Sequence, residues 1–193
     1  YYITPLDSVY TDTTVKEERW EYFYIPADVL NNSVNKQFNY ITIDKGKVQG
    51  VEPEMAVITH GAVVGVVASV SNNFSTVIPL LNRNFRLGSK ISRNDYFGIL
   101  EWGGMNPEFA RLREIPLHVD VARGDSIVTS GFSAIFPPGL DVGIIESFKV
   151  TDSNFYDIRV KLSVNFRNLT HVYVIGNIYR EEQLELENLQ GYD

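Results

Sequence analysis

The chain is a succession of short apolar runs, rich in β-branched and aromatic residues and bounded by turn residues. Asn39 to Asp44 alternates polar and apolar side chains, and Gly46 and Gly50 bracket the turn that follows. Such side chains suit a half-buried pleated surface, and short strands with frequent turns are typical of barrels and sandwiches. The pattern predicts an all-β fold, with strands over residues 22–30, 39–44, 56–59, 62–70, 76–81, 86–91, 96–102, 110–115, 126–129, 142–150, 155–164 and 172–178.

One strand–turn–strand pattern occurs twice. Residues 57–61 (Val-Ile-Thr-His-Gly) precede residues 64–67 (Val-Gly-Val-Val), and residues 127–131 (Ile-Val-Thr-Ser-Gly) precede, after an insertion, residues 142–145 (Val-Gly-Ile-Ile). A glycine within a strand permits the bulge or bend that closing a small barrel requires. A true repeat predicts two β-barrels, each of about half the chain, whereas chance similarity between valine-rich strands is the alternative.

The two ends of the chain depart from the strand pattern. Residues 1–21 are polar and aperiodic and predict a linker, and the absence of a signal peptide at the start makes us expect a missing upstream segment. Residues 180–190 are highly charged and are the only helix candidate. Residues 55–82 carry no Asp, Glu, Lys or Arg, but the polar residues and glycines that interrupt them predict strands and turns instead of a membrane helix.

Composition excludes several classes of function. The net charge is -7 at pH 7, and no cluster of basic residues stands out, so nucleic acid is not an expected partner. The chain has no cysteine, which removes disulfides, thiol catalysis and cysteine-ligated metals. Hydrophobic residues make up 44%, which is enough for a buried core.

No catalytic motif emerges from the polar residues. His60, His118 and His171 are isolated from one another and lack the spacing of a metal site. Gly124-Asp125-Ser126 is the tripeptide found around trypsin-like nucleophiles, but Ser126 opens a predicted strand. The sequence therefore predicts a binding or scaffolding module that is not an enzyme, with no catalytic residue, cofactor or metal.

Two alternatives stay open at this point. A secreted serine hydrolase on a two-barrel fold would use Ser126 as its nucleophile. A peptidoglycan- or carbohydrate-binding β-module would use the abundant tyrosines and the two tryptophans.

Two blocks of motifs resemble the extracytoplasmic domain of the MreC family, the bacterial rod-shape-determining proteins. The first block runs from Ile41 to Val67 and carries the glycine-bounded strands described above. The second contains Gly124 to Gly131 with its Thr-Ser-Gly ending, then Ile135-Phe-Pro-Pro-Gly-Leu140 and Val142-Gly143. The resemblance covers about residues 20–180, and the blocks occur in the same order as in the family.

The resemblance implies two small β-barrels in tandem, residues 22–98 and 99–180. Residues 1–21 would be a linker after an upstream coiled coil, and residues 181–193 a charged tail that includes a helix, with strand exchange between the barrels left open. It implies a non-catalytic scaffold of the cell-elongation complex, which organises peptidoglycan synthesis and rod shape. Expected partners are further copies of the chain, as a dimer or filament, and a class B penicillin-binding transpeptidase, with MreD and MreB as complex members. The domain would lie in the periplasm or on the extracytoplasmic face, held by an N-terminal membrane anchor.

The resemblance gives no residue-level partner site, but it suggests architectural roles for the motif residues. Prolines fix φ, glycines permit positive φ, and hydroxyl groups satisfy turn backbone. The expected turn and signature residues are Gly46, Gly50, Gly61, Gly65, Thr129, Ser130, Gly131, Phe136, Pro137, Gly139 and Gly143.

Overall fold

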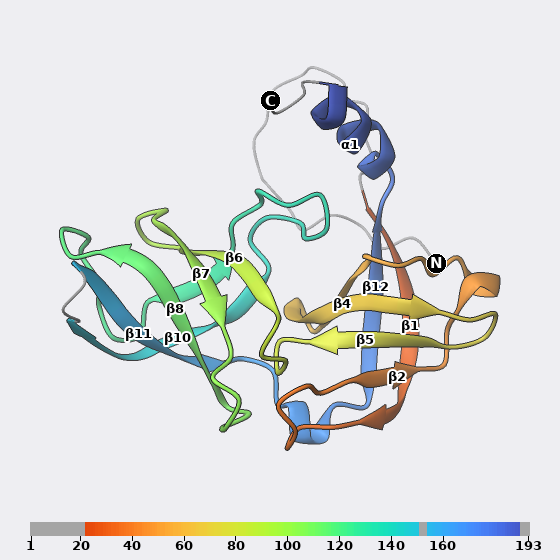
Figure 1. Cartoon of the computed structure of the whole chain (residues 1–193), viewed down its shortest axis with the longest axis horizontal. Helices are drawn as coiled ribbons and strands as arrows, with labels where there is room; N and C mark the ends of the chain where they lie inside the picture. The colour runs from red at the N-terminus through yellow and green to blue at the C-terminus, as the bar shows by residue number, and fades with distance from the viewer. Residues whose placement is uncertain (1–21, 151–153, 190–193) are drawn as a thin grey trace, which may run out of the picture.

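A computed structural model describes residues 22–150 and 154–189 (Figure 1). Strands dominate, which confirms the predicted mostly-β class, and each predicted strand is present with small differences at its ends. The elements are β1 Tyr22–Asn32, β2 Ile41–Ile43, η1 Lys47–Gln49, β3 Ala56–Thr59, β4 Ala62–Val70, β5 Ser75–Pro79, β6 Arg86–Ile91, β7 Phe97–Glu101, β8 Phe109–Pro116, β9 Ser126–Thr129, β10 Asp141–Val150, β11 Phe155–Leu162, η2 Phe166–Asn168, β12 His171–Asn177 and α1 Arg180–Leu189.

Six strands close into a barrel, which we call the terminal barrel because it contains β1 and β12. β1 pairs with β12 and β2, β2 with β5, β5 with β4, β4 with β3, and β3 with β12. Every one of these pairings is antiparallel, and closure removes the free edges that an open sheet would expose. Ile41, Ile43, Val57 and Val63 are fully buried, as expected for side chains that alternate into a barrel interior.

The other six strands, β6 to β11, are inserted in the chain between β5 and β12, and we call them the inserted ring. They pair antiparallel in the order β11-β8-β7-β6-β9-β10, and β10 pairs again with β11. The two groups of strands lie side by side in Figure 1. A single parallel pairing, Asp141 on β10 with Ala62 on β4, joins the two groups.

The pairings differ from the tandem division at residue 98 that the sequence led us to expect. β6 begins at Arg86 and pairs with β9, while β12 pairs with β1 at the far end of the chain. The pairing of β12 with β1 has a physical reason. β2 pairs only with the last residues of β1, from Val29 onward, so the backbone groups of the earlier residues of β1 need another partner, which β12 provides. Hydrophobic periodicity identifies a strand but not its partner. The linker expected over residues 1–21 lies outside the described residues.

The internal repeat maps onto corresponding positions of the two groups. β4 carries Gly65 and pairs with β3 and β5, whereas β10 carries Gly143 and pairs with β9 and β11. Register shifts occur on both strands, which indicates the bulges that let a short strand bend around a narrow barrel.

The helix predicted at the C-terminal end is present as α1. Its first residue, Arg180, forms an ion pair with Glu54 of the terminal barrel, while Leu186 and Leu189 are exposed. Two glutamates in the first turn, Glu181 and Glu182, interact favourably with the helix dipole. Of the helices in the described residues, none is long and apolar enough to span a membrane.

Candidate interaction surface

The loop between β9 and β10 is built around the buried hydroxyl of Thr129. This hydroxyl donates a hydrogen bond to the carbonyl oxygen of Pro137 at 2.7 Å and accepts one from the backbone N–H of Leu140 at 2.9 Å. The backbone N–H of Gly139 donates to the carbonyl of Thr129 at 3.1 Å. These bonds tie both ends of the loop together, and we call residues 130–140 the signature loop because they contain most of the second motif block.

The signature loop sits at the junction of the two groups of strands. The N–H of Ser130 donates to the carbonyl of Gly88 on β6 at 3.1 Å, and the N–H of Asp141 donates to the carbonyl of Gly61, in the β3–β4 turn, at 3.0 Å. Phe136 is buried and meets Phe85 edge-on, with ring centroids 6.5 Å apart. The loop is therefore anchored to both the inserted ring and the terminal barrel.

One aromatic side chain of the loop points away from this anchorage. Phe132 is 79% exposed and lies against Phe97 of β7, with ring centroids 4.5 Å apart. Its backbone N–H donates to the Ser130 hydroxyl at 3.3 Å, which fixes the turn that carries it. An exposed aromatic pair on a well-anchored loop resembles the aromatic anchors of protein interfaces, because little conformational entropy is lost when it binds.

Two clefts flank the loop. One of about 270 Å³ is lined by the loop together with Phe85 and Arg86, and the other, of about 310 Å³, lies between the loop, β12 and the start of α1. Glu54 and Ile135 line both clefts. The aromatic pair and these two hollows make the junction the candidate interaction surface.

The predicted glycines fall into two geometric groups. A Cβ atom on any of the first group would meet neighbouring backbone, as at Gly65 against the carbonyl of Ile78 and Gly143 against that of Lys161. Gly46 belongs to this group, since it lies against the backbone of residues 71–74. The second group has a left-handed backbone with φ near +80° and comprises Gly50, Gly61, Gly131 and Gly139.

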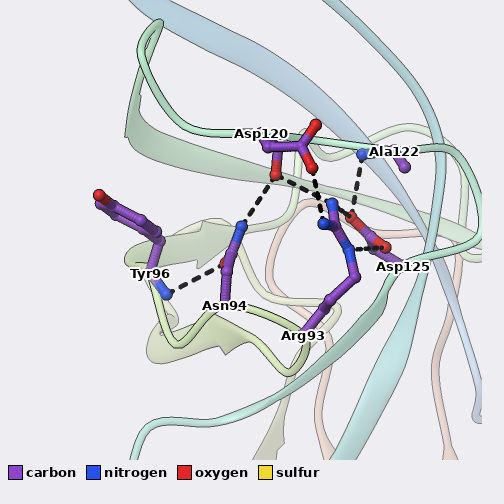
Figure 2. Close-up of polar contacts among 6 residues, drawn as sticks. All are labelled: Arg93, Asn94, Tyr96, Asp120, Ala122 and Asp125. Carbon is purple, nitrogen blue, oxygen red and sulfur yellow. Dashed lines mark hydrogen bonds and ion pairs between the residues drawn. The ribbon is translucent and has the colours of Figure 1, made fainter.

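In the Gly124-Asp125-Ser126 tripeptide, the Asp125 carboxylate accepts hydrogen bonds from Arg93 and from the backbone of Ala122 (Figure 2). Arg93, in the β6–β7 turn, donates two hydrogen bonds of 2.9 Å to the Asp125 carboxylate and one of 2.7 Å to Asp120. The N–H of Ala122 also donates to Asp125, at 2.9 Å. Ser126 is exposed at the start of β9, and none of the hydrogen bonds that the described residues form joins it to a histidine. The motif therefore braces two loops of the inserted ring and forms no triad.

The bidentate contact predicts an acid-dependent stability. Hydrogen bonds from Arg93, helped by the N–H of Ala122, hold the pKa of the Asp125 carboxyl below its usual value of 3.8, and the same contacts raise the pKa of Arg93. A lowered folded-state pKa stabilises the fold above the unfolded pKa, and that contribution is lost as pH falls through the folded value.

We therefore expect Asp125→Asn to be less stable than wild type at pH 7, with the difference shrinking below about pH 4. Urea unfolding at several pH values measures this. Asp95→Asn, which breaks the exposed ion pair between Asp95 and Lys90, is the control and is expected to have little effect at any pH. A pH-independent deficit for Asp125→Asn would contradict the assignment.

The three histidines and Trp102 occupy other structural positions, and Trp20 lies outside the described residues. His60 lies in the β3–β4 turn, His118 meets Tyr96 edge-on, and the His171 Nδ1 atom is 2.6 Å from the Asp28 Oδ1 atom. Across residues 22–150 and 154–189, no group of three or more His, Asp or Glu side chains is placed to hold a metal ion. Trp102 is buried and its indole N–H donates to the carbonyl of Asn106, so its ring is not available to stack on a sugar.

The sequence did not predict two features of the structure, the aromatic pair of the candidate surface and the Arg93 brace elsewhere in the inserted ring. Phe97 and Phe132 are 35 positions apart, and Arg93 is 32 positions from Asp125. The available signal for Phe132 was a phenylalanine flanked by Gly131 and Ser133 in a polar turn. Nothing in local sequence connects either pair, because strand pairing brings them together.

The chain is similar to proteins of one family. The family model described as "Rod shape-determining protein MreC, barrel core" matches residues 29–176. The cell shape-determining protein MreC of Bacillus subtilis is 32% identical over 169 residues, which cover 81% of this chain and 58% of that protein. The Listeria monocytogenes protein of the same name is 26% identical over 159 residues, or 80% of this chain and 54% of that protein. The chain thus spans a little over half the length of these relatives.

Solved structures have the same fold. The structure of MreC from Listeria monocytogenes has a TM-score of 0.73 at 26% identity, covering 81% of this chain and 76% of that one. The major periplasmic domain of "the cell shape-determining filament MreC" has a TM-score of 0.69 at 21% identity, covering 83% and 99%. MreC from Helicobacter pylori, solved as a complex with penicillin-binding protein PBP2, has a TM-score of 0.62 at 15% identity, covering 81% and 99%. Because the family model matches most of the chain and the fold agrees, the chain belongs to the MreC family of rod shape-determining proteins.

Proposed function

We propose that the chain is the extracytoplasmic scaffold domain of a bacterial cell-elongation complex, which organises peptidoglycan synthesis by binding a class B penicillin-binding transpeptidase and by self-association. Family membership supports this, as do two structural neighbours, one solved as a complex with PBP2 and the other described as a periplasmic domain of a filament. The domain would lie outside the cytoplasmic membrane, held by an N-terminal anchor, with MreD and MreB as further members of the complex. The inserted ring would act as a second small barrel beside the terminal one.

The observation that carries the proposal is the aromatic pair on the anchored signature loop. Phe132 and Phe97 present a pair of tilted rings to solvent, while Thr129 is buried and hydrogen-bonded to Pro137 and Leu140 near the C-terminal end of the loop. A rigid display of apolar area needs no catalytic group and suits a protein that positions another protein. The hydrolase alternative has no such support, because no hydrogen bond among the described residues joins Ser126 to a histidine that could act as its base.

The proposal predicts that Phe132→Ala weakens binding of the transpeptidase ectodomain by about tenfold to a hundredfold, the range for loss of an interface anchor. The ring is mostly exposed, so stability should change little. Calorimetric titration of the ectodomain with the wild-type and variant chains measures the two dissociation constants.

Phe74→Ala is the matched control, because Phe74 is 50% exposed in the β4–β5 turn of the terminal barrel. Equal affinities for all three chains would remove the signature loop from the interface. Absence of binding by the wild type would count against the proposed partner itself.

A further inference from the structure

The outer face of the inserted ring carries a row of charged side chains in register. Direct cross-strand partners run from Arg86 on β6 to Glu101 on β7, then to Arg111 on β8, Arg159 on β11 and Ser147 on β10. Their neighbours on the same face add further cations. The face, which we call the basic face, contains the cations Arg86, Arg111, Arg113, Lys149, Arg159 and Lys161 and the carboxylates Glu101 and Asp157.

This arrangement is unfavourable for the isolated chain. Arg111 and Arg159 are direct antiparallel partners, and like charges placed opposite one another destabilise a sheet. The Asp157 carboxylate is shared as an ion-pair partner by Arg111, Arg113 and Lys149. The nitrogen–oxygen distances are 3.5–3.7 Å, longer than those of close ion pairs. Among the described residues no carboxylate forms an ion pair with Arg159, whose guanidinium lies 3.8 Å from the centre of the Phe109 ring. A chain of net charge -7 therefore concentrates positive charge here without neutralising it.

The basic face is also hollowed and partly apolar. A groove of about 390 Å³ is lined by Arg111, Lys149 and Arg159 together with Phe109, Phe148 and Met105. Met105 is 91% exposed and Phe148 is 40% exposed. A ligand that fits this groove must combine negative charge with apolar side chains. Local conflicts of this kind are expected where a surface serves a partner.

The described chain contains one segment with that chemistry. Helix α1 exposes Glu181, Glu182 and Glu185 together with Leu186 and Leu189, the last of them 81% exposed. Ten helical residues extend about 15 Å. The row from β6 to β11 crosses three strand spacings, or about 14 Å, so a helix of this length matches the row.

We propose that the basic face binds α1 of a second copy of the chain, with the glutamates on the arginines and the leucines against Met105 and Phe109. The contact rests on the self-association proposed above and names its surfaces. In Figure 1, α1 projects beyond the terminal barrel, while β8, β10 and β11 lie in the inserted ring, away from α1. A helix at one place and a groove at another give a head-to-tail contact, which propagates into a chain of molecules unless the rotation closes a ring.

Charge reversal on each side tests the contact. Arg111→Glu with Arg159→Glu, and separately Glu182→Lys with Glu185→Lys, should each weaken self-association of the chain about tenfold or more, because like charges then meet. An equimolar mixture of the two double variants should recover the pairing, because the unchanged α1 of the first variant meets the unchanged basic face of the second, and the two changed surfaces are also complementary in charge. Sedimentation velocity over a range of salt concentrations measures all three, and the wild-type association should weaken as salt rises.

Lys36→Glu with Lys47→Glu is the control for the basic-face variant. It makes the same change of net charge as Arg111→Glu with Arg159→Glu, but on exposed residues of the terminal barrel, and it should associate as the wild type does. Arg159→Gln is the second variant for the basic face, in case the double charge reversal does not fold, and should weaken association without changing the circular dichroism spectrum.

Each failure has a distinct meaning. Wild-type association by both double variants would overturn the proposal, and so would loss of association only on the basic face, because α1 would then not be the occupant. A mixture that stays monomeric would overturn it as well. Binding of the transpeptidase ectodomain, titrated with the same variants, should be unchanged, so a failure of this contact is separable from a failure of the proposed scaffold function.

Discussion

Gly65→Ala is expected to lower the free energy of unfolding by about 3 kcal/mol, the upper part of the range for overpacking a well-packed core. A Cβ at this position would meet the carbonyl of Ile78 and lie 2.7 Å from the Cα of Pro79. Both contacts are with the backbone of β5, which cannot turn aside as a side chain would. Since Gly65 pairs with β3 and β5 together, relief of the clash would separate strands that close the terminal barrel.

Gly143→Ala should have a similar effect in the inserted ring. There the added Cβ would meet the carbonyl of Lys161 and lie 2.9 Å from the Val160 Cγ1 atom. Urea unfolding of each variant measures the loss, and Gly103→Ala is the control because its Cβ would meet nothing within 4 Å. The control is expected within about 0.5 kcal/mol of the wild type. Losses as small as that for Gly65→Ala and Gly143→Ala would mean that the strands shift easily and that barrel closure does not require these glycines.

Gly65 and Gly143 show which features of the fold could be predicted from the sequence. The repeated glycine-containing strands predicted bends in a closed sheet, and Gly65 and Gly143 lie on corresponding strands whose registers shift. Alternation of apolar and polar residues located the strands, as along β11, where Ile158, Val160 and Leu162 are buried and the intervening Arg159 and Lys161 are exposed. Both signals are local, and each records what one strand requires of its own surroundings.

What the sequence did not provide depends on which strands meet. The pairing of β1 with β12 joins residues 143 to 155 positions apart and places β12 in the terminal barrel. The pairing of β6 with β9 places the division between the two groups of strands before Arg86 instead of at residue 98. The same limit hid the contact of Phe97 with Phe132 and the brace from Arg93 to Asp125. The opposed Arg111 and Arg159 were invisible for a related reason, because each arginine is an ordinary exposed residue until β8 and β11 are aligned.

The second large effect is expected for Thr129→Val, which keeps the shape of the side chain and removes its hydroxyl. Thr129 is 1% exposed. Its hydroxyl donates a hydrogen bond to the carbonyl of Pro137 and accepts one from the backbone N–H of Leu140. Without it, the partly buried N–H of Leu140 and the buried carbonyl of Pro137 each lose a hydrogen bond. Leaving buried polar groups unsatisfied costs about 1–3 kcal/mol, so we expect a loss of about 2 kcal/mol in the free energy of unfolding.

Thr129→Ser is the matched control, because it retains the hydroxyl and gives up one methyl group, which is worth about 1 kcal/mol. The valine variant should therefore be the less stable of the two in urea unfolding, and its signature loop should be cut more rapidly by a protease. Equal stability of the two variants would mean that the hydroxyl contributes no more than the methyl group, about 1 kcal/mol, and would contradict the expected loss.

Binding separates the architectural role of Thr129 from the contact role of Phe132. Loosening the loop adds an ordering cost to any contact made through the aromatic pair, so Thr129→Val should weaken transpeptidase binding and stability together. Phe132→Ala should weaken binding and leave stability nearly unchanged, because its ring is mostly exposed. If Thr129→Val lowered stability but bound the transpeptidase like the wild type, the partner would recognise a surface that does not depend on the order of this loop.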